Sequence, residues 1–183
     1  MNSKTKKVVL SGMFVAIGLF LPFITGEIPT IGKMLLPMHI PVLLCGLIVG
    51  WKYGLAVGIV LPILRSFLFG MPPLYPVAIA MAFEMGTYGF VSGFFYSRSK
   101  FQCTKSLYRC IIVAMLAGRL VWAGSEFVLL GIDGNIFTWK MFVSGAFFNA
   151  IPGIVLQLIL IPTVMIALHR TKLIPFYKNS CKK

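Results

Sequence analysis

Residues 141–168 read MFVSGAFFNAIPGIVLQLILIPTVMIAL and contain no charged side chain. A stretch of this length and apolarity is long enough to cross the hydrocarbon core of a bilayer as one α-helix, which takes about 20 residues. A second uncharged stretch, residues 8–26, lies near the N-terminus. Both runs are continuous in hydropathy, and this favours helices over the alternating strands of about 10 residues that build an outer-membrane barrel.

The composition of the whole chain points the same way. The 183 residues are 58% hydrophobic and 11% charged, with a mean hydropathy of +0.93. Soluble domains carry about a quarter of their residues as charged side chains. Soluble enzymes, disordered tails and nucleic-acid-binding modules are therefore excluded, despite a net charge of +13. We predict an all-α integral membrane protein, with residues 1–183 forming a single membrane domain.

Proline, glycine and basic residues divide the apolar sequence into six expected transmembrane helices. The basic start followed by an apolar run resembles a signal peptide, but no small-residue cleavage site follows, so we expect a retained first helix. A proline- and glycine-broken stretch, a tight Met71-Pro-Pro-Leu-Tyr75 connection and a basic loop separate later helices. The expected helices cover residues 7–23, 39–50, 54–69, 76–96, 110–130 and 141–168.

The positive charges predict the orientation of these helices. Cytoplasmic loops of membrane proteins carry an excess of Lys and Arg. With both termini on the cytoplasmic side, Lys33 and Lys140 alone fall in outer loops. This topology predicts a multi-pass membrane protein, and anionic lipid, not nucleic acid, accounts for the positive charge. The expected cytoplasmic residues are Lys4, Lys6, Lys7, Lys52, Arg98, Lys100, Lys105, Arg109, Arg170, Lys172, Lys178, Lys182 and Lys183.

Four ionisable side chains fall inside the expected helices, where charge is costly and usually faces a cavity or a partner. A helix rises about 1.5 Å per residue, so their depths follow from the helix ends. Arg65 and Glu126 lie near the outer ends, whereas Glu84 and Arg119 lie nearer the midplane. Matched depths predict two couples, Arg65 with Glu126 and Glu84 with Arg119.

These charges have two interpretations from the sequence. They fasten helices together as ion pairs, or they line a polar ligand cavity that opens outward. Arg119, Trp122 and Glu126 are spaced to share one helix face, and a few polar groups in an aromatic-rich apolar wall are typical of a small-molecule site. The candidate substrate-binding residues are Arg65, Tyr75, Glu84, Tyr88, Arg119, Trp122, Glu126 and Asn149, with Gln157 as a further neutral group.

No pattern in the chain indicates catalysis, a metal or a cofactor. The nucleotide-binding pattern G-x-x-x-x-G-K-[ST] is absent, as are nucleophile and zinc-site patterns. His39 and His169 lie near the ends of expected helices, and we interpret them as interfacial side chains. The cysteines, at positions 45, 103, 110 and 181, lack metal-ligand spacing and are expected to be free thiols.

Small residues four positions apart mark expected close contacts between helices. Such pairs let helix backbones approach each other in lipid, where association depends on packing. The pairs are Gly12 with Ala16, Gly54 with Gly58, Gly89 with Gly93 and Ala114 with Gly118.

Several stretches together resemble a known family. They are LPMHIPVLLCG at residues 36–46, GWKYG at 50–54, LPILRSFLFG at 61–70, MPPLYP at 71–76 and AFEMGTYG at 82–89. With the chain length, the six-helix plan and the small-residue pair on the first helix, they resemble the substrate-binding S components of energy-coupling factor (ECF) vitamin transporters. The resemblance covers nearly the whole chain and is strongest over residues 7–96.

The resemblance implies a function and a set of partners. S components bind a vitamin near the outer face, and a membrane coupling protein (the T component) and two cytoplasmic ATPases supply the energy. An alanine-x-x-x-alanine motif on the first helix contacts the coupling protein, and Gly12 and Ala16 occupy its positions here. The resemblance also implies that the chain itself is not an enzyme and that it is a multi-pass protein of a prokaryotic plasma membrane.

The sequence is compatible with more than one substrate and more than one source of energy. The resemblance favours pantothenate. An anion needs Arg65 or Arg119 free of its carboxylate partner, whereas two closed couples favour a neutral ligand such as riboflavin or a pyridoxine-like ring. A self-sufficient secondary transporter of a small polar metabolite is the alternative function, and it predicts internal repeats, none of which is visible. A small membrane assembly or an enzyme subunit is the third hypothesis.

Overall fold

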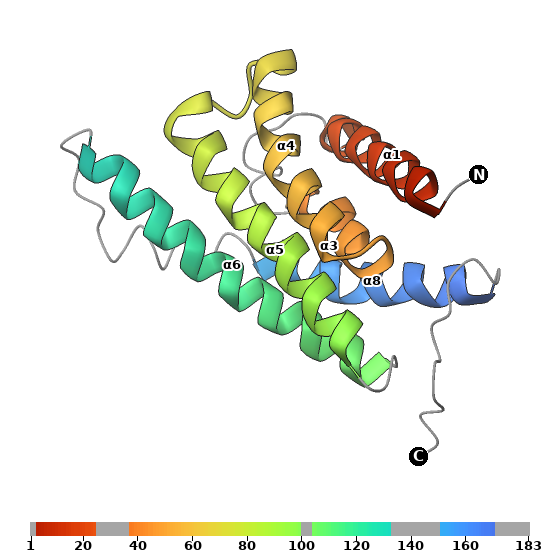
Figure 1. Cartoon of the computed structure of the whole chain (residues 1–183). Helices are drawn as coiled ribbons and strands as arrows, with labels where there is room; N and C mark the ends of the chain where they lie inside the picture. The colour runs from red at the N-terminus through yellow and green to blue at the C-terminus, as the bar shows by residue number, and fades with distance from the viewer. Residues whose placement is uncertain (1–2, 25–36, 100–103, 133–150, 171–183) are drawn as a thin grey trace.

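The computed structural model describes residues 3–24, 37–99, 104–132 and 151–170, and these contain helices and turns but no strand (Figure 1). The all-helical fold class is confirmed. Five helices are long and apolar enough to cross a membrane, and α3 is a shorter apolar helix. The elements are α1 (Ser3–Ile24), α3 (His39–Ile48), α4 (Trp51–Phe69), the π-helical turn η1 (Leu74–Ala78), α5 (Ile79–Arg98), α6 (Thr104–Ile132) and α8 (Ile151–Arg170).

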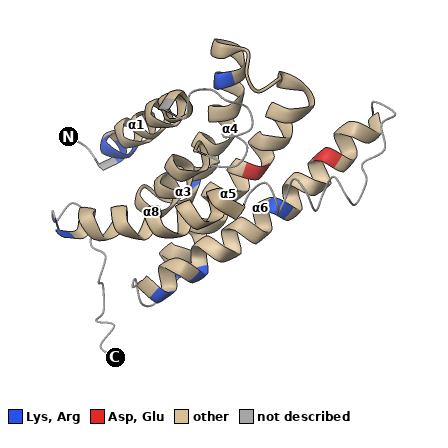
Figure 2. Cartoon of the chain, turned by 180° about the vertical axis from the view of Figure 1, so that it is seen from behind, with Lys and Arg blue, Asp and Glu red and all other residues tan. Residues whose placement is uncertain are grey.

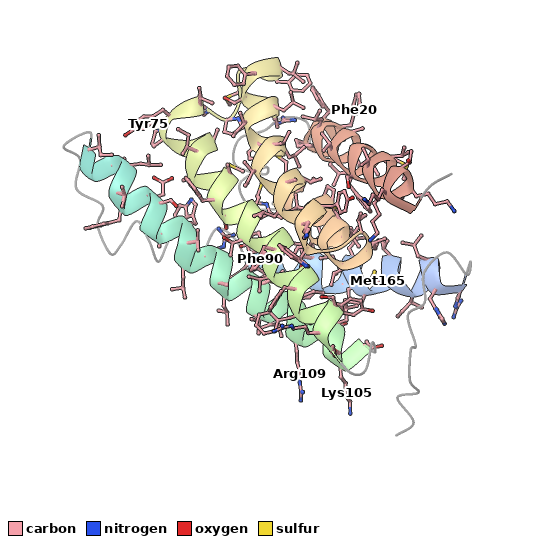
Figure 3. All side chains as sticks on the ribbon, in the orientation of Figure 1. Phe20, Tyr75, Phe90, Lys105, Arg109 and Met165 are labelled. Carbon is pink, nitrogen blue, oxygen red and sulfur yellow. The ribbon has the colours of Figure 1, made fainter. Side chains whose placement is uncertain are left out.

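Several helix boundaries differ by a few residues from those expected; α1 begins at Ser3 and α4 at Trp51, before the expected residues 7 and 54. The helix expected from residue 110 begins at Thr104, so Lys105 and Arg109 belong to its first turns and not to a loop. Lys105 and Arg109 project away from the bundle there (Figure 3). The helix expected from residue 76 is preceded by η1, in which Tyr75 has extended backbone angles. For the last expected helix, residues 141–150 lie outside the described residues.

Helix α5 is at the centre of the bundle (Figure 1). It lies between α4 and α6, and α3 packs against both α4 and α5. Helix α1 covers α3 and α4, whereas α8 lies against α3 and α6. Figure 2 shows basic residues at the start of α1, the start of α6 and the end of α8, on one side of the bundle. This distribution agrees with the orientation expected from the sequence.

Glycines bring α3, α4 and α5 into close contact, as the small-residue spacing predicts. A Cβ atom added at Gly54 would lie 2.6 Å from the Cα of Gly46 and 2.7 Å from the carbonyl oxygen of Gly89. One added at Gly89 would overlap the carbonyl of Gly54, and one at Gly58 would overlap the backbone of Met85. The close approach buries the middle of α5, which carries the charged residue of the site described below.

We expect Gly89→Ala to destabilise the protein and Gly12→Ala to leave its stability unchanged or slightly higher. The added methyl at Gly89 meets backbone that cannot move aside alone, and overpacking commonly costs about 1–3 kcal/mol. A Cβ at Gly12 has no neighbouring atom within 4 Å in the described structure. Thermal unfolding in detergent checks both variants, and equal midpoints would contradict the contact.

Candidate functional site

Glu84 lies at the centre of a buried polar cluster that joins α5 to α6. Glu84 is only 2% exposed. The Oε1 atom accepts a hydrogen bond of 2.9 Å from the Tyr88 hydroxyl, one turn further along α5. The same oxygen lies 3.0 Å from Nη1 of Arg119 on α6. The predicted Glu84–Arg119 couple is therefore confirmed, and a buried carboxylate is matched by a buried guanidinium.

His39 belongs to this cluster, and its interpretation as an interfacial residue is wrong. The residue is 1% exposed, and its Nε2 lies 3.8 Å from Oε1 of Glu84. Its ring meets the Tyr88 ring edge-on at 5.2 Å between centroids. The signal was present in the sequence: α3, HIPVLLCGLI, is apolar on all sides, and such a helix is buried together with any polar residue that it carries.

Several polar atoms in and beside the cluster have no hydrogen-bond partner among the described residues. They are Nε and Nη2 of Arg119, Nε2 of Gln157 and both ring nitrogens of His39. Counting about 1.5 Å per residue from the basic helix ends, Glu84, Arg119 and Gln157 all lie at a depth of roughly 20 Å. Buried polar groups are nearly always paired, so we expect these atoms to bind water, a residue outside the described ranges or the polar part of a ligand.

Glu126 lies two turns further along α6 than Arg119, on the same face. It is 8% exposed. Among the residues that the structure describes, none forms an ion pair or hydrogen bond with its carboxylate. The predicted Arg65–Glu126 couple is therefore wrong.

Arg65 instead holds α4 to α1. Its Nη1 donates a hydrogen bond of 2.9 Å to the Leu19 carbonyl. The guanidinium lies over the rings of Phe23 and Phe69, at 5.3 Å and 5.4 Å from their centroids. Matched depth failed as a criterion because it gives no information on which way a side chain points: α4 and α6 lie on opposite sides of α5 (Figure 1).

Two aromatic residues lie along the outer part of α6. Tyr75 of η1, labelled in Figure 3, extends toward α6, and its hydroxyl donates a hydrogen bond of 2.7 Å to the Leu129 carbonyl. Trp122 is partly buried and lies between Arg119 and Glu126 along the helix. Asn149 lies outside the described residues.

The small-residue pair on α1 is exposed, unlike the glycines of the bundle. Gly12 and Ala16 lie on the outer surface of the helix. Gly18, on the other side of α1, faces Leu61 of α4. The pair is surrounded by the exposed apolar residues Val8, Val9, Met13, Ile17 and Phe20.

Five described helices are long and apolar enough to cross a membrane and enclose a buried polar cluster, so they define a multi-pass membrane protein. The family model described as ECF transporter, substrate-specific component, matches residues 6–165. The chain belongs to this family. No curated protein and no solved structure matches the chain. It is thus a substrate-binding component of an ECF transporter in the cell membrane, and not an enzyme.

Proposed function

We propose that this protein binds a water-soluble vitamin inside the membrane and carries it across as the S component of an ECF-type ABC importer. The observation that carries the proposal is the buried cluster of Glu84, Tyr88, Arg119 and His39. It pairs Glu84 with Arg119 and still leaves several polar atoms without a partner among the described residues. Such atoms, enclosed by apolar and aromatic side chains, suit a small molecule with several polar atoms.

The energy comes from partners: a membrane coupling protein and two cytoplasmic ATPases. The chain has no nucleotide-binding loop of its own. The exposed face of Gly12 and Ala16 on α1 suits close contact with another membrane helix, because small residues allow backbones to approach. This face is the proposed contact with the coupling protein.

Two kinds of substrate are candidates. The sequence resemblance favours pantothenate, whose carboxylate needs a free cation. Arg119 is engaged by Glu84 and Arg65 by the Leu19 carbonyl, so the described geometry favours a substrate without negative charge. The site residues proposed to contact it are Tyr88, Arg119, Trp122, Glu126 and Asn149, with Glu84 and Tyr75 beside them.

Reconstitution tests the division of labour. Alone in liposomes, the protein should bind a vitamin from a mixture and fail to concentrate it, with or without an ion gradient. Adding the coupling protein, both ATPases and ATP should restore accumulation, measured with radiolabelled vitamins. Gradient-driven accumulation by the single chain would contradict the proposal and favour a secondary transporter.

A further inference from the structure

Glu126 is a membrane-embedded carboxylate that the described chain does not neutralise. The two membrane-embedded arginines are already engaged elsewhere: Arg119 pairs with Glu84, and Arg65 donates to the Leu19 carbonyl of α1. No described Lys, Arg or His lies within ion-pair distance of Glu126. Ionisable groups at such positions face partners or transported molecules, because an isolated charge is costly in the membrane.

Aromatic side chains flank Glu126 along α6. Trp122 lies one turn before it, and the Tyr75 hydroxyl is bonded to the carbonyl of Leu129, one turn after it. A carboxylate with aromatic residues within a turn of it along the helix suits a cation, which is attracted both by the negative charge and by ring faces. The described buried acidic groups of this region, Glu84 and Glu126, outnumber its one arginine, Arg119.

We propose that the substrate carries a positively charged nitrogen and that Glu126 binds it. This inference rests on the proposed function, since it narrows the class of vitamin that the site accepts. The opposite end of the substrate then meets the donors of Arg119 and Gln157. Arg119 lies about 10 Å from Glu126 along the helix axis, at about 1.5 Å per residue. The substrate therefore has a cationic end and an end with hydrogen-bond acceptors.

The inference is tested by measuring how a panel of vitamins of different charge binds to the full chain in detergent. The panel holds thiamine and pyridoxamine as cations, riboflavin and pyridoxine as neutral molecules, and pantothenate and biotin as anions. Calorimetric titration should give the highest affinity for a cation. The nearly isosteric Glu126→Gln should lower the affinity for that cation about tenfold or more, as expected for loss of a charge-assisted contact.

Matched variants separate this role from a structural one. Glu126→Gln should leave the unfolding temperature unchanged or raised, because an unpaired buried charge is removed. Lys33→Gln and Lys140→Gln remove the two basic residues expected in the outer loops, and each should leave the affinity for the cation within about twofold. Loss of binding with either variant would identify a protein partner for Glu126 and overturn the inference.

The remaining outcomes are equally decisive. Tightest binding of a neutral or anionic compound, or a loss of affinity of less than about tenfold in Glu126→Gln, would overturn the inference while the proposed vitamin uptake stands. The wild-type ranking does not depend on any variant folding. If no compound of the panel binds to folded protein, the vitamin-binding function itself fails, and the inference fails with it.

Discussion

Gly12→Trp and Ala16→Trp, made singly, should abolish vitamin uptake by the assembled transporter and leave binding by the solitary protein within about twofold of wild type. Both residues are exposed on α1 and are surrounded by exposed apolar side chains. A Cβ atom at Gly12 meets no other part of the described chain and Ala16 is exposed, so we expect folding and substrate affinity to be preserved. An indole at either position does prevent the close backbone approach that a partner helix requires. Uptake in vesicles and calorimetric titration in detergent measure the two effects.

Gly18→Trp on the same helix is the matched control. A Cβ atom at Gly18 already overlaps the side chain of Leu61, so a bulky residue there should disturb folding and reduce binding and uptake together. Parallel loss of binding and uptake in Gly12→Trp or Ala16→Trp would show that their face serves internal packing, and would contradict a docking role.

Breaking the Glu84–Arg119 pair should give the largest effect on the site. Arg119→Gln alone strands a carboxylate that is 2% exposed, and breaking one side of a buried pair commonly costs about 3–5 kcal/mol of stability. The double variant Glu84→Gln with Arg119→Gln removes both charges, so it should recover folding. It also removes guanidinium donors that the structure leaves unpartnered, and it should therefore bind the vitamin at least about tenfold more weakly.

Thermal unfolding and titration of the three proteins separate the two interpretations of the pair. A double variant that folds and binds like wild type would show that the pair only fastens α5 to α6. Trp122→Ala provides an independent comparison, since loss of an aromatic side chain that the ligand buries commonly costs about 2 kcal/mol or more, roughly thirtyfold in affinity. If both variants bind the vitamin with wild-type affinity, α5 and α6 do not form the binding site.

Hydropathy and residue spacing predicted the helices and their closest contacts. The continuous apolar runs identified the helices, and the glycines of α4 and α5 meet as their spacing predicts. The Glu84–Arg119 couple followed from matched depth along two helices that are neighbours in the fold. Periodicity was informative at these positions because the helices concerned are adjacent.

The same reasoning failed where the direction of a side chain decided the contact. Arg65 lies at the expected depth but points to α1 and not to Glu126, since α5 separates α4 from α6. His39 lies near the end of a helix in sequence, yet α3 is only 10 residues long and is enclosed by its neighbours. Depth along a helix follows from counting residues, whereas rotation and burial depend on packing.

The most direct test is mass spectrometry of the small molecule that co-purifies with the protein in detergent after growth with mixed vitamins. The account predicts that the wild type carries a water-soluble vitamin at about one molecule per chain and that the folded Glu84→Gln, Arg119→Gln double variant carries little or none. A folded wild type that carries no vitamin, or equal occupancy in the two proteins, would contradict vitamin binding at this cluster.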